Sequence, residues 1–239
     1  GAAVGFWHTP RVETLMGDSS KVAAEAGSRI AGANQANKDS GLSFSFSMAG
    51  SVYKIAQEFD GITILAALDY ITPWKNKDPA INKVHNAWRD ANKADLICLM
   101  VDGTRVGNAG GYAWMLKDVK GDDTYAYSTI LHTGGSAIYK LVTFSHEIGH
   151  NMGLYHDATQ SAANGGRTGI FANSWGNHFT GTDNKGYHTI MAYPKNGFSN
   201  SVLLWSGPNV DYKGVKTGSA AADAVGTLKQ TNGPVSKYK

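Results

Sequence analysis

The chain has 239 residues, of which 42% are hydrophobic and 17% are charged, and a formal net charge of +3; this size fits one hydrophobic core, so we expect residues 1–239 to form a single domain. Its one cysteine, Cys98, excludes an internal disulfide and a cysteine-cluster metal site. No apolar run approaches the roughly 18 residues of a membrane span, and the 22 lysines and arginines are dispersed, so we expect neither a membrane nor a nucleic-acid partner.

The first half of the chain alternates strand-like and helical patterns. A short apolar run ends at Thr9-Pro10, and Asp18 can cap a helix whose apolar residues recur at helical spacing. Asp78 and the proline after it mark the start of another helix. The expected elements are strands at Ala3–His8, Leu42–Val52 and Asp95–Val101, and helices from Asp18 to Gly41 and from Asp78 to near Lys93.

The second half begins in the same way and then changes. Two shorter strands are expected at Tyr112–Leu116 and Thr124–Ile130, and a helix at Ser136–Met152. Beyond Gly153 the sequence is rich in glycine and asparagine, with one helix expected at Ser219–Leu228. Because strands alternate with helices and residues 95–101 form a strand without a polar face, the sequence predicts an α/β fold with a buried sheet.

The segment from His146 to His156 has the spacing HExxHxxGxxH. His146 and His150 lie four residues apart, so a helix places both imidazoles on one face, where they can bind one ion at roughly 2.0–2.1 Å. Gly153 can adopt the positive φ that breaks the helix and turns the chain back, so that His156 supplies the third ligand. Three neutral nitrogens leave one coordination position for water, which is typical of a catalytic zinc site.

Glu147 follows His146 directly and is expected to flank the zinc-bound water without being a ligand. It can accept the proton of that water and pass it to the leaving amine, while zinc lowers the pKa of the water to about 7. These residues predict a zinc-dependent endopeptidase with one catalytic Zn²⁺. They leave the binding of Ca²⁺ undecided.

A second informative segment runs from Thr189 to Pro194 and contains Met191, 35 residues after His156. The histidine motif followed by such a methionine is the signature of the metzincin metallopeptidases. The chain most resembles their adamalysin (reprolysin-like) branch, in which an aspartate follows the third histidine as Asp157 does here, and it looks like a disulfide-free, bacterial-type secreted form. The resemblance implies that Met191 forms an apolar floor beneath the histidines and that Asp157 anchors the lower subdomain to this turn.

The resemblance also implies a fold, an α+β form of the α/β class. A twisted five-stranded mixed sheet and helices lie above a horizontal cleft, with a loop-rich C-terminal subdomain carrying one helix below it. Residues 1–156 would form the upper subdomain and residues 157–239 the lower one.

Several substrate contacts follow from the same resemblance. Tyr112, Ala113 and Trp114 would lie on an antiparallel edge strand to which an extended peptide adds by main-chain hydrogen bonds, with a purely structural edge strand as the alternative. Pro194 would lie in the wall of the pocket for the side chain after the scissile bond. Tyr193 resembles a tyrosine that ligates zinc and supports the transition state in astacins and serralysins, with a place in the pocket wall as the alternative.

The resemblance further implies a secreted, extracellular enzyme that acts on polypeptides as a monomer. The start at Gly1, without a methionine, suits either a mature enzyme from which a leader and a zymogen's pro-segment have been removed or a sequence shortened in some other way, and we expect the mature enzyme.

The sequence also bears on other zinc sites and other functions. A glutamate ligand downstream of the motif is excluded, because no glutamate follows Glu147. Asp183 is a weaker candidate ligand and is expected in a surface turn, and His132, His178 and His188 lack paired spacing. Two alternative functions remain: a catalytically silent zinc-binding homologue that acts as a binding module, and a metallohydrolase that acts on non-peptide amides.

Overall fold

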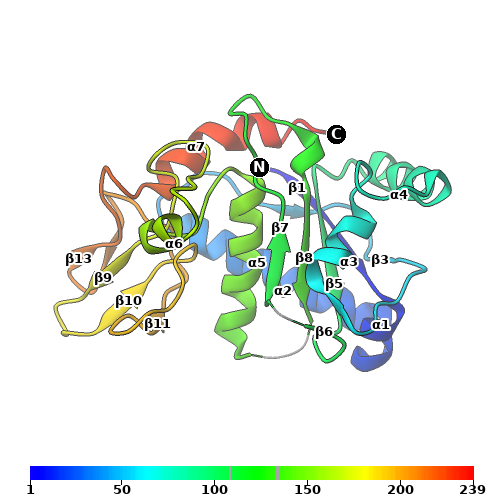
Figure 1. Ribbon diagram of the computed structural model, residues 1–239, viewed down its shortest axis with the longest axis horizontal. Coiled ribbons are helices and arrows are strands. Elements are labelled where there is room, and N and C mark those ends of the chain that lie inside the picture. The colour runs from blue at the N-terminus through cyan, green and yellow to red at the C-terminus, as the bar shows by residue number, and fades with distance from the viewer. Residues whose placement is uncertain (108, 133–134) are drawn as a thin grey trace.

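The computed structural model describes residues 1–107, 109–132 and 135–239, and a mixed sheet lies at its centre (Figure 1). The strand order is β2-β1-β5-β8-β7, and β3 pairs with the same edge of β1 as β2 does. All pairs are parallel except β7 with β8. The predicted mixed sheet is therefore confirmed: five strand positions lie across it, and β2 and β3 share the position beside β1. Its strands are β1 (Ala3–His8), β2 (Ser47–Met48), β3 (Tyr53–Lys54), β5 (Leu96–Val101), β7 (Gly111–Ala113) and β8 (Tyr127–Leu131).

Neighbouring residues of β1 show how helices cover both faces of the sheet. Phe6 packs against Phe144 of α5 (Ala137–Asn151), with ring centroids 5.1 Å apart. Trp7 points to the opposite face and contacts His85 and Trp88 of α4 (Pro79–Ala91). Because both faces are covered, every residue of β5 is buried, including Cys98, as expected for a central parallel strand.

The long helices begin where the sequence places their caps. Asp18 accepts a hydrogen bond from the backbone N–H of Lys21 at the start of α2 (Ser19–Asp39), and Asp78 caps α4 in the same way. Ser136 caps α5. A capping side chain satisfies a backbone N–H that has no partner inside the helix, so these local signals predict helix starts well.

The expected strand at Leu42–Val52 is mostly irregular, and only Ser47–Met48 pairs with β1. Asn34 of α2 explains the difference, because its side-chain amide exchanges two hydrogen bonds with the backbone of Phe46, at 2.7 and 2.9 Å. Asn37 donates to the carbonyl of Phe44 in the same segment. Side chains of α2 thus take the place of the strand-to-strand hydrogen bonds that the alternating pattern predicted.

The helix expected at Ser219–Leu228 is displaced toward the C-terminus. Asp223 accepts a hydrogen bond from the N–H of Gly226 and starts α7 (Ala224–Val235), while Ser219 and Ala222 form a β-bridge ahead of it. The elements that complete the described chain are α1 (Pro10–Met16), β4 (Ile62–Thr63), α3 (Ile64–Ile71), β6 (Val106–Gly107), a 3-10 turn at Asp123–Tyr125, α6 (Ala158–Ala163), β9 (His178–Thr180), β10 (Gly186–His188), β11 (Asn200–Ser201), β12 (Asp211–Tyr212) and β13 (Val215–Lys216).

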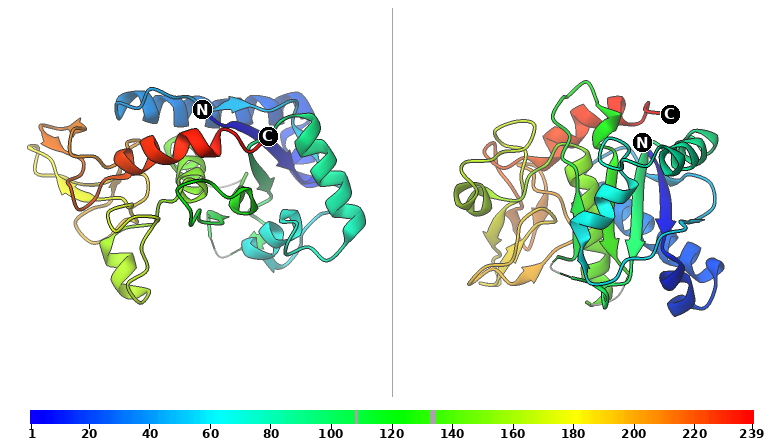
Figure 2. Two further views of the ribbon diagram at one scale, coloured as in Figure 1. Left: turned by 90° about the horizontal axis from the view of Figure 1, so that it is seen from above. Right: turned by 45° about the vertical axis from the view of Figure 1, so that its right-hand side comes forward.

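The two chain ends lie on one side of the molecule, as both views of Figure 2 show. The buried carboxylate of Asp95 accepts hydrogen bonds from the backbone N–H groups of Ala3, at 2.8 Å, and Lys239, at 3.2 Å. The C-terminal segment is thereby held against the start of the sheet, after α7 has returned from the loop-rich part. Among the described residues, no helix combines the length and apolarity needed to cross a membrane.

Candidate metal centre

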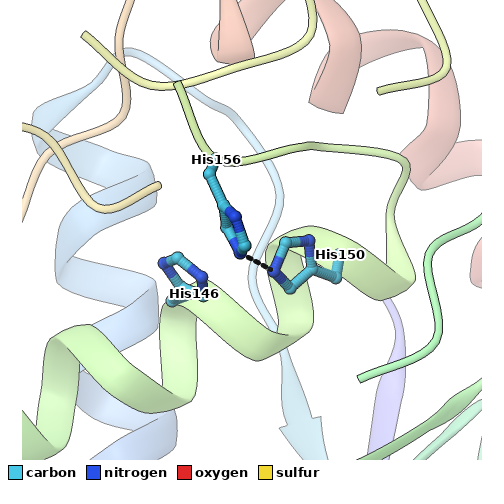
Figure 3. Close-up of side chains that lie close together, drawn as sticks. All are labelled: His146, His150 and His156. Atoms are coloured by element: carbon cyan, nitrogen blue, oxygen red, sulfur yellow. Dashed lines mark hydrogen bonds between the residues drawn. The ribbon is translucent and has the colours of Figure 1, made fainter. Parts of the chain in front are cut away.

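The three histidines of the motif converge on one point (Figure 3). His146 and His150 lie on one face of α5, and Gly153 has a φ of 94°, which turns the chain back toward the helix. His156 follows this turn, and one nitrogen from each ring lies within 4.8 Å of the other two. The helix spacing and the glycine therefore position the three side chains as the sequence predicted.

The inward-facing ring nitrogens of His146 and His150 carry lone pairs. Nδ1 of His146 lies 2.9 Å from the carbonyl oxygen of Ile190, and Nδ1 of His150 lies 2.7 Å from that of Leu154. Because a carbonyl only accepts, both Nδ1 atoms carry the proton and both Nε2 atoms are free to bind a metal.

The spacing of the nitrogens fits a metal ion. Nε2 of His150 lies 3.1 Å from Nε2 of His156, close to the separation of about 3.3–3.4 Å between two ligands of a tetrahedral ion with 2.0–2.1 Å bonds. A set of three imidazoles suits zinc better than magnesium or calcium, which prefer oxygen ligands. The residues present therefore fit zinc.

Burial keeps all three imidazoles neutral at neutral pH. It lowers the pKa of His146 to about 4 and is the largest cause that lowers the pKa of His156 to about 3, to which the charges of His146 and Arg167 add. The pKa of His150 is also far below its usual value, for the same first reason. Neutral imidazole is the form that binds a metal, so the environment prepares the site for a cation.

Glu147 lies in the same helix and is 5% exposed. Its Oε2 atom is buried without a hydrogen-bond partner, and burial raises the pKa of its carboxyl group well above the usual value. The edge strand β7 passes directly beside it, because a Cβ atom at Gly111 would collide with this carboxylate. A buried carboxylate without a partner is costly, so the arrangement calls for a cation or a proton donor at this position.

Met191 lies against α5, the helix that carries His146 and His150. It is 1% exposed, and its sulfur is so close to α5 that a Cβ atom at Gly149 would lie 2.5 Å from it. The preceding residue, Ile190, provides the carbonyl that orients His146. The segment that contains Ile190 and Met191 thus packs against the backbone of α5 and orients the imidazole of His146.

Asp157 connects α6 to the segment that contains Tyr193. One carboxylate oxygen accepts from the N–H of Gln160 and caps α6, and the other accepts from the N–H of Tyr193, both at 3.0 Å. Asp157 is 1% exposed and lines neither of the hollows beside Glu147. These contacts tie the start of α6 to the segment that contains Met191 and Tyr193.

Tyr193 lies beside the histidines. Its hydroxyl is 3.1 Å from Nε2 of His156, and its ring stacks on that of His146 at 5.7 Å and 13°. Partial burial, and then the charge of Glu147, raise the pKa of its hydroxyl, so it stays protonated and can donate a hydrogen bond. The ring is 40% exposed and also lines the hollows on both sides of Glu147.

Two hollows meet at Glu147. The larger hollow, about 770 Å³, has apolar walls that include Ile138, Val142 and Pro194. The smaller hollow, about 340 Å³, lies on the other side and is lined by Tyr112, Ala113 and Arg167 among others. Pro194 thus lines the larger hollow, and Tyr112 and Ala113 line the smaller one.

Trp114 does not line either hollow. Its ring packs against Trp74 at 4.8 Å and its Nε1 donates to the hydroxyl of Thr72. The carbonyl of Trp114 accepts a hydrogen bond from the side-chain amide of Asn151, the last residue of α5. This bond holds the end of α5 against the chain that follows β7. The side chain of Trp114 is held by Trp74 and Thr72 instead of lining the cleft.

The other candidate ligands lie outside the histidine group. Asp183 accepts from the hydroxyl of Tyr187 at 2.6 Å in an exposed turn. His178 lies 2.7 Å from the carbonyl of Tyr193, and His188 lines the larger hollow. Sequence patterns did not indicate Gln160, Asn164 and Arg167, which line the smaller hollow, because no periodicity or spacing marks the short helix α6 and the loop after it.

Comparisons with known proteins agree with this geometry. The model of metallo-peptidase family M12 named Reprolysin_5 matches residues 11–205, which include the three histidines. No curated protein matches the sequence.

Many solved structures are similar to this chain, among them the following two. One, described as "Structure of a chaperone-substrate complex", is 19% identical with a TM-score of 0.71, over 100% of this chain and 35% of that chain, so it supports the fold alone. The chain thus spans about a third of that relative. The other is metalloproteinase-II from Bacteroides fragilis, 16% identical over 66% of this chain and 44% of that chain, with a TM-score of 0.42. The family match covers most of the sequence and the histidine site lies within it, so the chain belongs to metallo-peptidase family M12.

Proposed function

We propose that this protein is a zinc-dependent endopeptidase in which Glu147 is the general base. The observation that supports this proposal best is the buried carboxylate of Glu147, whose Oε2 atom has no hydrogen-bond partner, in the helix turn that carries two of three imidazoles with converging nitrogens. A site that only retained zinc for stability would need the histidines alone. A carboxylate kept beside them at the cost of burial indicates that it takes part in proton transfer.

His146, His150 and His156 would hold the zinc ion. When bound, zinc supplies Lewis-acid polarisation of the scissile carbonyl and lowers the pKa of water. Glu147, whose carboxyl pKa is raised by burial, would be ionised at neutral pH beside such a cation.

Glu147 then accepts a proton from the attacking water and delivers it to the nitrogen of the leaving amine. One carboxylate can do both because it lies at the junction of the two hollows and so faces both sides of the scissile bond. Tyr193 donates a hydrogen bond from its protonated hydroxyl to the carbonyl oxygen as negative charge develops there.

The edge strand β7 positions the substrate. Its described residues pair with β8 on one side only, so the backbone groups on the other side are available to an extended peptide. Met191 and Asp157 support the residues that do the chemistry from below.

The test is hydrolysis of a quenched fluorescent peptide library and of a denatured protein. We expect cleavage that a chelator abolishes and zinc restores. Glu147→Gln should bind one zinc per chain, yet lose at least about 10²-fold to 10⁴-fold in turnover, the usual contribution of a general base. The control is Glu13→Gln, which removes a carboxylate that pairs with Lys54 at the surface and should leave turnover unchanged.

Two results would contradict the proposal. Full zinc occupancy of the wild type without cleavage of any peptide would favour a zinc-binding module. Hydrolysis of small non-peptide amides without cleavage of polypeptides would favour a different metallohydrolase.

A further inference from the structure

The smaller hollow has an unusual distribution of charge. Glu147 and Arg167 are the lining residues with formally charged side chains, and Glu147 belongs to the catalytic site. In residues 1–107, 109–132 and 135–239, Arg167 takes part in no ion pair, and its side chain is exposed. A guanidinium at the wall of a substrate cleft, without a carboxylate of its own, is available to a ligand.

The backbone on both sides of Arg167 is held in place. The N–H of Gly166 donates to the carbonyl of Ser161 at 2.8 Å, which folds the loop back onto α6. The N–H of Ile170 donates to the carbonyl of Gly153 at 2.7 Å, next to the turn of the zinc motif. Arg167 is therefore tied to both α6 and the metal site, so its place at the smaller hollow follows from the fold.

The polar character of this wall contrasts with the other side of the cleft. Gln160 and Asn164 of the same helix and loop line the smaller hollow next to Arg167, whereas Ile138, Val142 and Pro194 line the larger one. A carboxylate near Arg167 can accept two hydrogen bonds from the guanidinium and further ones from the neighbouring amides. The smaller hollow thus suits an acidic side chain, and the larger one an apolar side chain.

The course of β7 decides which part of a substrate meets Arg167. Gly110 lines only the larger hollow, while Ala113 and Met115 line only the smaller one. The strand therefore runs from the larger hollow to the smaller one. A peptide that adds antiparallel to β7, the more stable pairing, enters the smaller hollow with the residues that precede the scissile bond.

We propose that Arg167 selects substrates that carry an aspartate or glutamate within the three residues before the scissile bond. This inference rests on the proposed peptidase function and extends it to a class of substrate. An ion pair at a partly exposed site contributes modestly, and hydrogen bonds to a charged group add to it. We therefore expect about a threefold to tenfold higher kcat/KM for an acidic residue than for its amide at the preferred position.

The test is a competition assay. A neutral parent peptide is varied by placing Glu or Gln at each of the three positions before and after the scissile bond. Mass spectrometry of mixed peptides gives ratios of kcat/KM that do not depend on the fraction of active enzyme. We expect the Glu/Gln ratio of the wild type to exceed one at a position before the scissile bond and to fall as salt is added.

Matched variants assign the preference to Arg167. Arg167→Gln should lower the ratio to about one, Arg167→Lys should retain part of it, and Arg167→Glu should bring it below one. Lys185→Gln, which removes an exposed cation in the turn between β9 and β10, should retain the wild-type ratio.

Three results would overturn the inference: a wild-type ratio near one at every position, a preference found only after the scissile bond, or an unchanged ratio in Arg167→Gln. Each of these leaves the proposed peptidase function intact, because peptides are still cleaved. Failure of the wild type to cleave any peptide would instead refute the proposed function itself.

Discussion

Asp157 offers the sharpest test of how the residues after His156 support the histidine site. Its carboxylate is buried and accepts two backbone hydrogen bonds, one that caps α6 and one from the N–H of Tyr193. Asp157→Ala removes both acceptors at once. The residue lines neither hollow, so any loss of activity arises through the groups that it holds in place.

The magnitude follows from the two bonds. Loss of a capping side chain costs about 1 kcal/mol, and a buried N–H left without a partner costs about 1–3 kcal/mol. We expect Asp157→Ala to lower the free energy of unfolding by about 2–4 kcal/mol. Asp157→Asn replaces one acceptor oxygen by an NH₂ group that faces a backbone N–H, so we expect it to lose about 1–3 kcal/mol.

Urea unfolding with zinc present measures this loss, and a peptide assay measures kcat. Because Tyr193 is released from its anchor, kcat should fall in both variants even when zinc occupancy is complete. The control is Asp183→Asn, an exposed carboxylate that accepts from Tyr187 and Lys185, which should change stability by less than about 1 kcal/mol. A stability of Asp157→Ala within about 0.5 kcal/mol of the wild type would refute the reasoning.

Three further predictions concern other parts of the molecule. Burial lowers the pKa of His85 to about 4, so between pH 6.5 and 4 the unfolded chain binds a proton that the folded chain does not. The free energy of unfolding should therefore fall by up to about 3 kcal/mol as the pH drops through this range. Urea unfolding of His85→Phe should show a smaller dependence on pH, and an equal dependence in the two proteins would mean that the imidazole is charged in the folded protein. Gly149→Ala places a Cβ atom against the sulfur of Met191 and should cost about 1–3 kcal/mol, whereas Gly27→Ala in α2, where a Cβ atom meets nothing within 4 Å, should stabilise the protein by about 0.5–1 kcal/mol; equal effects of both in thermal unfolding would contradict the packing of Met191. Tyr193→Phe keeps the stacked ring and removes only the hydroxyl, so stability should hardly change while kcat falls by about 10²-fold to 10³-fold; an unchanged kcat would make Tyr193 a wall residue only.

Local sequence signals determined the helices and the metal ligands of this protein. Asp18, Asp78 and Ser136 start their helices because a cap acts on N–H groups two or three residues away. His146, His150 and Gly153 act over equally short distances, so their spacing was enough to predict the convergence of the ligands. The apolar run at 96–101 likewise identified the central strand, since burial on both faces leaves no polar position.

Contacts between distant segments were decided only by the tertiary structure. The amide of Asn34 replaces a strand partner for residues near Phe46, and Trp114 turns toward Trp74 instead of the cleft. Neither is visible in a periodic pattern, because each depends on a partner brought close by folding. The same holds for the carbonyl of Ile190 that orients His146 and for the loop that carries Arg167. Chemistry confined to one turn of helix can be predicted from residue spacing, whereas the walls of the cleft come from separate segments that share no such spacing.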